Sequence, residues 1–194
     1  PTGRSESREV IEAVLDAAPG LVVVDEAYGQ FARWSALELV ADDVPLVVVR
    51  TYSKTWSMAA ARLGYLVGPA PVVAALEQVA LPYHLDAMKQ LAGSLALRFK
   101  PEMEARVAIV NEERGRIAAT LAGLPVETWP SDANFLLFRP LAKDADAVWK
   151  ELLDRSVLVR NCASWPRLAG CLRVTVGTPE ENTAFLDALT EILT

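Results

Sequence analysis

The chain has 194 residues, which on a prior of about 100–200 residues per domain is room for one domain, or for one domain and part of another. Hydrophobic residues make up 52% of it, which excludes a disordered chain, and no uncharged apolar run of about 18 residues predicts a membrane-spanning helix. The formal net charge of −6, without a block of Lys or Arg, argues against nucleic acid or an anionic membrane as a partner. Any anion must therefore be bound by a local site.

Cysteine and histidine are too scarce for a metal cluster. Cys162 and Cys171 are the only cysteines and His84 is the only histidine, so no metal site is predicted. A disulfide is not expected, because nothing in the sequence indicates secretion. The chain does not open with a basic stretch followed by an apolar one, so we expect no signal peptide and predict a cytoplasmic protein.

The first part of the chain predicts alternating helices and strands. Apolar residues recur at helical spacing from Ser5 until Pro19-Gly20 stops the pattern. Two apolar runs then lack polar alternation, which favours strands buried on both faces, as in a parallel sheet covered by helices. The order helix, strand, helix, strand argues for an α/β layer architecture. The expected elements are helices over residues 5–18 and 34–40 and strands over residues 21–24, 46–49 and 63–67.

The rest of the chain begins with helices and continues as an α+β region. Pro101 is expected to interrupt a long helical stretch, and Gly123 to end it. Thr178 is the predicted N-cap of the closing helix, with Pro179 at its first position. The expected elements are helices over residues 71–79, 87–99, 102–122, 144–155 and 179–193 and strands over residues 126–129, 135–139, 157–160 and 172–176.

Polar side chains follow two of the predicted strands. Asp25 ends the first apolar run, where it would either bind a ligand in the crevice outside the strand ends or cap the next helix. The run over residues 46–49 leads into Thr51, Ser53 and Lys54, and Arg62 follows. Two hydroxyls at alternate positions and an arginine supply hydrogen-bond donors for a phosphate around one amine.

Together, these two segments resemble the fold-type I pyridoxal-phosphate-dependent aminotransferases. Asp25-x-x-Tyr28 follows one strand, and Thr51-x-Ser53-Lys54 with Arg62 follows the next. Pro1-Thr2-Gly3 is similar to the end of that family's Asn-Pro-Thr-Gly turn, and residues 171–182 are similar to its C-terminal arginine segment. The resemblance covers essentially the whole chain.

The resemblance implies an α/β fold. Residues 1–100 would be part of the cofactor-binding large domain, with a mainly parallel sheet and helices. Residues 101–194 would be an α+β C-terminal small domain. A long helix that is interrupted near Pro101 would join the two.

The resemblance also implies pyridoxal 5'-phosphate as the cofactor. Lys54 would hold the cofactor aldehyde through its amine and later act as the base that moves a proton. Asp25 would keep the pyridinium nitrogen protonated, and Tyr28 would hydrogen-bond the phenolic oxygen. Thr51, Ser53 and Arg62 would bind the phosphate. Trp34, Trp129, Trp149 and Trp165 are expected to pack rather than to stack on a cofactor.

Two arginines are candidates for binding the substrate. Arg173 would bind its anionic group, and Arg160 is a second candidate, consistent with a substrate phosphate or second carboxylate that needs two cations. Residues 50–65, 159–161 and 170–173 look most like the histidinol-phosphate aminotransferases. This likeness implies transamination between histidinol phosphate and 2-oxoglutarate in histidine biosynthesis, by a homodimer.

Other interpretations stay open. Aromatic amino acid aminotransferases have similar motifs, and phosphothreonine decarboxylases share the lysine and phosphate-binding frame. From another class, the chain could be an aminotransferase-like regulator domain, although it contains no helix-turn-helix and no basic patch. It could also be an inactive truncated product. The family's Gly-rich phosphate turn and ring-stacking aromatic residue are absent from these residues, so we expect a fragment that lacks the amino-terminal half and binds the cofactor weakly or not at all.

Overall fold

The computed structural model describes residues 2–194, and Pro1 of the Pro-Thr-Gly sequence lies outside the described residues. The chain forms two compact units. We call residues 5–107 the amino-terminal unit, and residues 2–4 with 108–194 the carboxy-terminal unit. The division falls inside α4 (Lys100–Leu121), so this helix contributes to both units.

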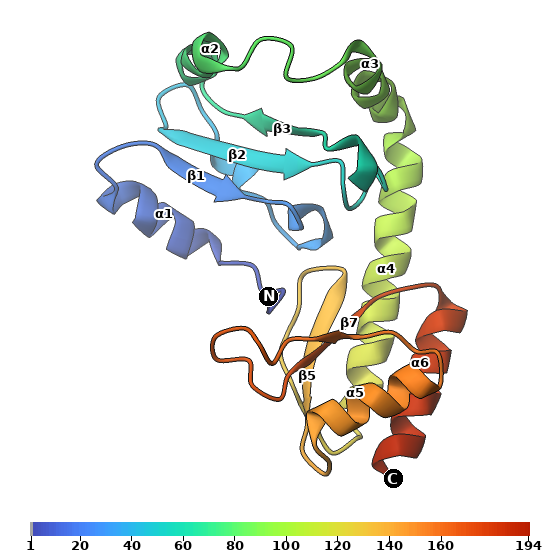
Figure 1. Ribbon diagram of the computed structural model, residues 1–194. Helices are drawn as coiled ribbons and strands as arrows, with labels where there is room; N and C mark the ends of the chain where they lie inside the picture. The colour runs from blue at the N-terminus through green and yellow to red at the C-terminus, as the bar shows by residue number, and fades with distance from the viewer. Residues whose placement is uncertain (1) are drawn as a thin grey trace. The chain divides into compact units, whose positions relative to one another are not determined.

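The amino-terminal unit contains a three-stranded sheet in the order β1-β2-β3 (Figure 1). β1 (Val22–Asp25) runs parallel to β2 (Leu46–Thr51), while β3 (Gly64–Val67) runs antiparallel to β2. All three strands were predicted from the apolar runs. Because parallel strands end at the same edge of a sheet, the segments that follow β1 and β2 emerge side by side.

The burial of the sheet differs between its strands. Leu46, Val47 and Val48 of β2 are almost completely buried. On β1, Val22 and Val24 pack against a core cluster built around Ala36, but Val23 is 59% exposed. The prediction that the first strand is buried on both faces was therefore wrong for the described chain, because β1 lies at the edge of the sheet and its second face is uncovered there.

The helices of this unit are short. The helix predicted over residues 34–40 was wrong, because this stretch forms only a 3-10 turn. The backbone is extended at Ser35, which caps the turn, and extended again at Val40, which ends it. The long helical stretch is interrupted before Pro101, by a 3-10 turn over Leu97–Phe99, and α4 begins at Lys100. Pro101 lies in the first turn of α4, where a proline is tolerated. The elements are α1 (Arg8–Ala17), α2 (Ala70–Val79), α3 (Ala87–Ala96) and the 3-10 turns η1 (Gly29–Phe31), η2 (Ala36–Leu39), η3 (Ala59–Ala61) and η4 (Leu97–Phe99).

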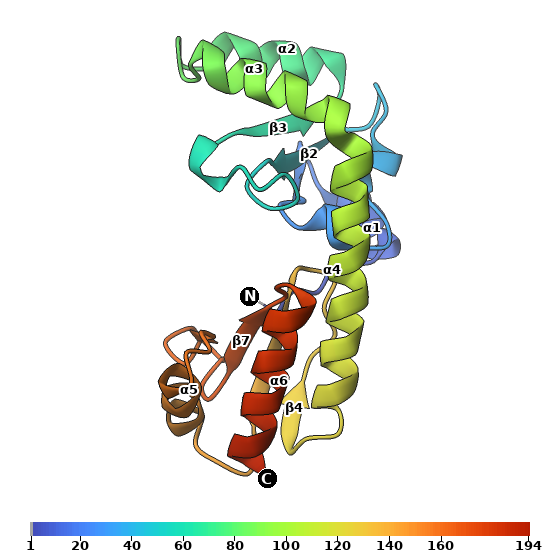
Figure 2. The ribbon, with the colours of Figure 1, turned by 90° about the vertical axis from the view of Figure 1, so that its right-hand side faces the viewer.

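The carboxy-terminal unit is built on an antiparallel sheet in the order β4-β5-β7-β6. Leu136, Phe138, Leu172 and Val174 project from one face into the main core, which α5, α6 and the end of α4 cover. Figure 2 shows α6 beside α4. The strand expected over residues 157–160 is shorter and begins later. The elements are β4 (Val126–Thr128), β5 (Phe135–Pro140), α5 (Ala145–Asp154), β6 (Arg160–Asn161), β7 (Leu172–Thr175) and α6 (Pro179–Leu193).

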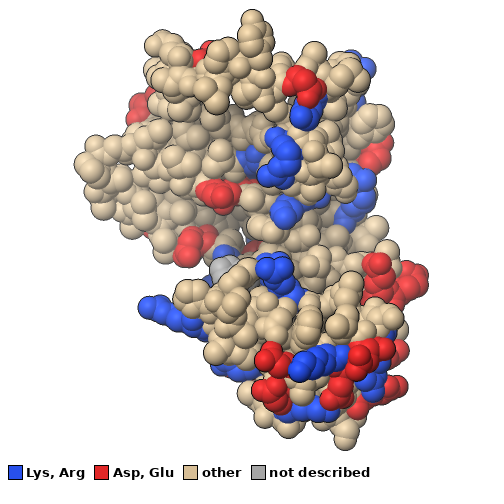
Figure 3. All heavy atoms as spheres, in the orientation of Figure 1, with Lys and Arg blue, Asp and Glu red and all other residues tan. Residues whose placement is uncertain are grey.

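The surface over α5 and α6 carries acidic and basic side chains side by side (Figure 3), including the ion pair of Arg155 with Glu191. None of the helices within residues 2–194 is long and apolar enough to cross a membrane. In the same residues, no three His, Cys, Asp or Glu side chains are grouped as a metal site requires.

A buried polar cluster joins α4 to the start of α6. The Glu113 carboxylate accepts hydrogen bonds from Arg116 (Nη2 to Oε2, 2.7 Å) and from Asn182 (Nδ2 to Oε2, 2.7 Å). Asn182 in turn accepts from the backbone N–H of Gly177 at 2.8 Å. As predicted, Thr178 is the N-cap of α6, and it forms a capping box with Glu181.

This cluster predicts a loss of stability in acid. The hydrogen bonds from Arg116 and Asn182 hold the pKa of Glu113 below its ordinary 4.5. A depressed folded-state pKa contributes stability above the unfolded pKa and loses it as pH falls through the folded value. We expect Glu113→Gln to lower the free energy of unfolding at pH 7 and to flatten its decline between about pH 5 and 3. Urea unfolding measures both, with Glu112→Gln on the exposed side of α4 as the control. A variant whose unfolding free energy declines in acid as steeply as the wild type's would contradict the assignment.

Candidate active site

The carboxyl ends of β1 and β2 form one corner of the amino-terminal unit. The register pairs Asp25 with Val49, and the backbone N–H of Glu26 donates to the Val49 carbonyl at 2.8 Å. Asp25 is exposed there, and its Oδ1 accepts from the Ala27 backbone N–H at 2.9 Å. The next helical turn starts at Gly29 with Tyr28 as its N-cap, so Asp25 closes a local turn rather than capping a helix. Its carboxylate remains accessible to a ligand.

Lys54 lies on the segment that follows β2, and its side chain lies beside the ring of Tyr28. The lysine is exposed, and its Nζ lies 5.0 Å from the centre of the Tyr28 ring. Thr51 shapes the segment, because its hydroxyl accepts from the Ser53 N–H at 3.0 Å and donates to the Leu63 carbonyl at 3.4 Å. The two predicted motifs therefore meet in space through an amine and an aromatic ring.

The loops that carry these residues are tied together and supported from below. The Thr55 hydroxyl donates to Oε1 of Gln30 at 2.6 Å, which links the Lys54 segment to the Tyr28 turn. Beneath the loop, Tyr52 and Trp56 are buried with ring centres 5.7 Å apart. The Tyr52 hydroxyl also donates to the Gly93 carbonyl on α3 at 3.2 Å. The exposed amine of Lys54 is thus carried by a loop that buried contacts hold in place.

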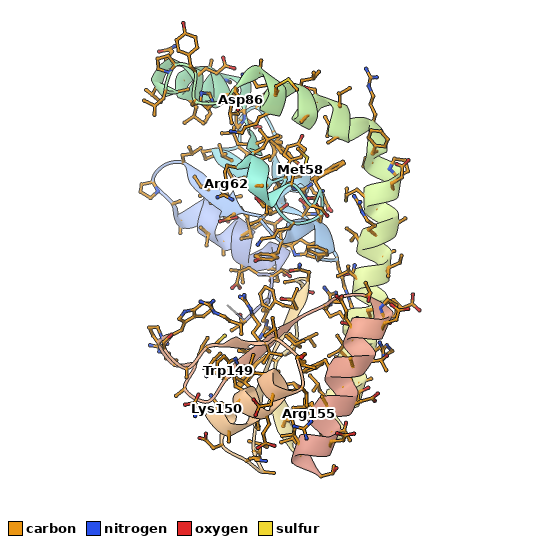
Figure 4. All side chains as sticks on the ribbon, turned by 45° about the vertical axis from the view of Figure 1, so that its right-hand side comes forward. Met58, Arg62, Asp86, Trp149, Lys150 and Arg155 are labelled. Carbon is orange, nitrogen blue, oxygen red and sulfur yellow. The ribbon has the colours of Figure 1, made fainter. Side chains whose placement is uncertain are left out.

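Arg62 stands at the end of the same loop. Figure 4 shows it with Met58 on the turn between β2 and β3. Its backbone is left-handed (φ 52°), as is that of Ser57 (φ 56°), conformations that non-glycine residues adopt only where the surrounding structure imposes them. The exposed guanidinium donates to the Ala59 carbonyl at 3.2 Å. Arg62 directly precedes Leu63, whose carbonyl accepts a hydrogen bond from the Thr51 hydroxyl. The backbone of Arg62 therefore lies close to Thr51.

These residues fit a phosphorylated aldehyde. Within residues 2–194, neither Lys54 nor Arg62 has an acidic partner, so both cations are available to a ligand. An amine can react with an aldehyde, while a guanidinium and the Ser53 hydroxyl can bind a phosphate. The Thr51 hydroxyl can do so by turning its one O–H away from the Leu63 carbonyl, to which the contact is long at 3.4 Å. Asp25 adds a carboxylate that can pair with a protonated ring nitrogen.

A buried ion pair that was not predicted from the sequence lies beside this corner. Glu26, 8% exposed, follows Asp25, and its Oε2 accepts from Nε and Nη2 of Arg50 at 3.0 and 2.8 Å. The carboxylate also accepts from the Ser35 hydroxyl and, at 2.6 Å, from the Ala36 N–H. The signal that could have found it is an arginine near the end of a buried apolar strand, together with an acid that directly follows the neighbouring strand.

The two candidate substrate arginines belong to the carboxy-terminal unit. Arg160 on β6 is directly opposite Arg173 on β7 in the antiparallel register. Neither has an ion pair within the described part of the chain, and Nε of Arg173 is buried without a hydrogen-bond partner there. Arg173 Cζ lies 4.5 Å from the centre of the Phe135 ring. The predicted residues therefore form two groups, one in each unit.

Comparison with known proteins identifies the family. The family model described as "Aminotransferase class I and II" matches residues 1–189. The chain belongs to the class I and II aminotransferases. Members of this aminotransferase family are enzymes that depend on pyridoxal 5'-phosphate. The fold class implied by the resemblance is confirmed by the match of this structure to solved aminotransferase structures.

The aminotransferase chain is similar to named relatives over its whole length. It is 43% identical to a histidinol-phosphate aminotransferase of Mycobacterium avium (strain 104) over 99% of this chain and 48% of the relative. It is 42% identical to one of Corynebacterium glutamicum (strain R) over 100% of this chain and 52% of the relative. It thus spans about half the length of these relatives.

A solved structure gives the same picture. The histidinol-phosphate aminotransferase of Sinorhizobium meliloti, in complex with pyridoxal 5'-phosphate, matches with a TM-score of 0.83 and 25% identity. The match covers 100% of this aminotransferase chain and 54% of that chain.

The Glu26–Arg50 pair generates a prediction on stability. Glu26→Ala leaves the Arg50 guanidinium, 13% exposed, without its acid, which costs about 3–5 kcal/mol of unfolding free energy. Glu38→Ala is the matched control, because its surface contact with Arg8 is worth at most about 1 kcal/mol. Urea unfolding monitored by tryptophan fluorescence measures both variants. Equal effects of the two substitutions would show that the buried pair does not hold the corner.

Proposed function

We propose that this chain supplies the lysine-bearing half of an active site for pyridoxal-phosphate-dependent transamination, with histidinol phosphate as amino donor and 2-oxoglutarate as acceptor. The observation that carries the proposal is the meeting of Lys54 and Tyr28 at the sheet edge where Asp25 also emerges. The names of the relatives support the choice of donor. The corresponding biological role is histidine biosynthesis.

The side chains divide the work of holding the cofactor. When bound, pyridoxal 5'-phosphate supplies an electron sink for breaking a bond at the substrate carbon. Lys54 would hold its aldehyde and then move the proton, roles for which an exposed amine without an acidic partner is suited. Asp25 accepts the ring N–H. Tyr28 donates to the phenolic oxygen, which its place beside Lys54 allows.

The phosphate of the cofactor is assigned to the segment that leaves β2. The Thr51 and Ser53 hydroxyls and the Arg62 guanidinium are donors on one connection, between β2 and β3. A guanidinium stays charged at every physiological pH and can donate two parallel hydrogen bonds to phosphate oxygens. The left-handed backbone at Arg62 turns the chain at this point. This one connection would therefore supply three of the donors that hold the phosphate.

The arginine pair supports a phosphorylated donor. Histidinol phosphate carries a phosphate and no carboxylate, so its anionic group brings two charges to one site. Arg160 and Arg173 lie opposite each other and lack acidic partners in the described chain, which suits a dianion. An aromatic amino acid brings one carboxylate and would need one of the two. This pairing is the observation that favours histidinol phosphate over an aromatic donor.

We also propose a cytoplasmic homodimer, as is typical of the family. In the described chain, large apolar side chains are exposed on α1, on β1 and just before β1. Association of two copies of the chain would remove them from water. These side chains are Val10, Val14, Leu21 and Val23.

The cofactor assignment predicts one modified lysine. In a protein completed with the amino-terminal half of the Mycobacterium avium relative, added pyridoxal 5'-phosphate should give a visible absorbance band. Borohydride reduction should then fix a pyridoxyl group on Lys54, located by peptide mass spectrometry. Lys54→Ala should abolish both signals, whereas Lys150→Ala on exposed α5 should leave both unchanged. A band that survives Lys54→Ala would overturn the assignment, and no uptake by the wild type would favour an inactive product.

The donor assignment predicts an asymmetry between the two arginines. One charge-assisted contact is worth about 1.5–3 kcal/mol, so Arg173→Ala should weaken apparent donor affinity about 10- to 100-fold. Arg160→Ala should do the same for histidinol phosphate but cost less for phenylalanine. Single-turnover rates of the completed enzyme with both donors measure this, with Arg155→Ala as the control. A wild-type preference for phenylalanine, or an equal Arg160 effect on both donors, would favour an aromatic aminotransferase.

A further inference from the structure

One face of the sheet in the carboxy-terminal unit carries a line of cations. The register places Arg160 opposite Arg173, and Arg139 follows on the same face of β5. Arg139 is neutralised by Glu127, with 2.7 Å between Nη1 and Oε2. Arg160 and Arg173 have no such acid among residues 2–194. Like charges directly opposite each other destabilise a sheet, so some other contact must hold this pair in place.

Trp165 makes that contact. Its indole lies under both guanidinium groups, with 5.7 Å from the ring centre to Arg173 Cζ and 5.9 Å to Arg160 Cζ. The ring sits on the loop between β6 and β7, which folds back over the sheet. Two backbone bonds fix the turn: the Trp165 N–H donates to the Cys162 carbonyl at 3.0 Å, and the Leu168 N–H donates to Trp165 at 3.1 Å.

The loop is anchored to the sheet by a small core. Leu137, Cys162, Leu168 and Cys171 are buried together, and Trp165 packs against them. One part of the indole therefore packs, as expected from the sequence, while its face meets the cations. Because the core holds the ring through contacts separate from those with the arginines, the ring can serve as a support for them.

An aromatic face and a carboxylate act differently on an arginine. The negative face of an indole attracts a guanidinium without neutralising it, and the N–H groups at the guanidinium edge stay available. A carboxylate would occupy those N–H groups and compete with any other anion. An indole under two guanidinium groups therefore lowers the cost of bringing two positive charges together while leaving both able to donate.

We propose that Trp165 is a positioning residue that holds Arg160 and Arg173 ready to bind one doubly charged anion, such as a phosphate monoester. The proposal rests on the proposed function for the role of the two arginines. It goes beyond that function in assigning a residue outside every motif that carries the family resemblance, and one that touches the arginines rather than the reacting atoms.

The test uses the 194-residue chain and inorganic phosphate at pH 8, where phosphate is mainly a dianion. Phosphate affinity is measured by ³¹P NMR titration at constant ionic strength. We expect Trp165→Leu to weaken phosphate binding about 3- to 20-fold, in keeping with the loss of partly desolvated cation–π contacts. Trp165→Phe keeps an aromatic face and should stay within about 3-fold of the wild type. Rescue by phenylalanine but not leucine identifies the ring face as the active feature.

Trp129→Leu is the matched control. Trp129 packs against the same small core, and its ring lies 5.3 Å from Arg139 Cζ, but that arginine is already paired with Glu127. The substitution removes the same kind of contact from the same face, and it should leave phosphate affinity unchanged. Equal losses in Trp129→Leu and Trp165→Leu would show that only packing matters and would overturn the proposal.

Two further measurements separate positioning from a general structural effect. In a variant with Arg160→Gln and Arg173→Gln, adding Trp165→Leu should change phosphate affinity no further, because the ring acts through the arginines. The Nε–H of Arg173 is buried, and its exchange with water, followed by NMR, should accelerate in Trp165→Leu but not in Trp129→Leu.

The outcomes also separate this proposal from the proposed function. A wild-type chain that binds no phosphate, or a Trp165→Leu chain that binds it as the wild type does, overturns the positioning role. A completed enzyme that fails to use histidinol phosphate, while phosphate affinity still depends on Trp165 as stated, overturns the donor assignment and leaves the positioning role standing.

Discussion

The ion pair between Glu26 and Arg50 fixes how the two parallel strands of the amino-terminal unit end. Apolar strands such as β1 and β2 could pair in more than one register, because their similar side chains distinguish poorly between alignments. A slip by one residue would move every side chain to the opposite face of the sheet. A buried charge pair is satisfied in only one alignment, where Glu26 meets Arg50. That alignment also decides what emerges beside it.

Two of the candidate cofactor-binding residues are neighbours of this pair in the sequence. Asp25 precedes Glu26, and Thr51 follows Arg50. Glu26 is buried and Arg50 is half-buried, and their contact fixes the backbone of Asp25 and Thr51 beside them at the sheet edge. The same division is seen in the loop beyond, where Lys54 is exposed while Thr55 and Trp56 are buried. Asp25 and Lys54 are thus exposed groups whose immediate neighbours supply the rigidity.

In the carboxy-terminal unit, the two faces of one sheet differ in character. One face is apolar and binds helices, which stabilises the unit. The other brings Arg160 and Arg173 together, which costs stability and places two cations where we propose that an anion binds. Aromatic rings on that face, Phe135 and Trp165, lower the cost without neutralising the charge. Arg139, with Glu127 beside it, shows the alternative arrangement in which a carboxylate neutralises the charge of the guanidinium.

The sequence by itself determined the features that depend on neighbours along the chain. The apolar run over 46–49 predicted β2, and Thr178-Pro179 predicted the start of α6, because burial patterns and caps are local. The spacing from Asp25 to Tyr28 and from Thr51 to Lys54 indicated the family. Only the tertiary structure decided the antiparallel pairing of β3, the exposure of Val23, the Glu26–Arg50 pair and the sharing of Trp165 by two arginines. Each of these depends on which distant segments meet, and no local pattern records the partner.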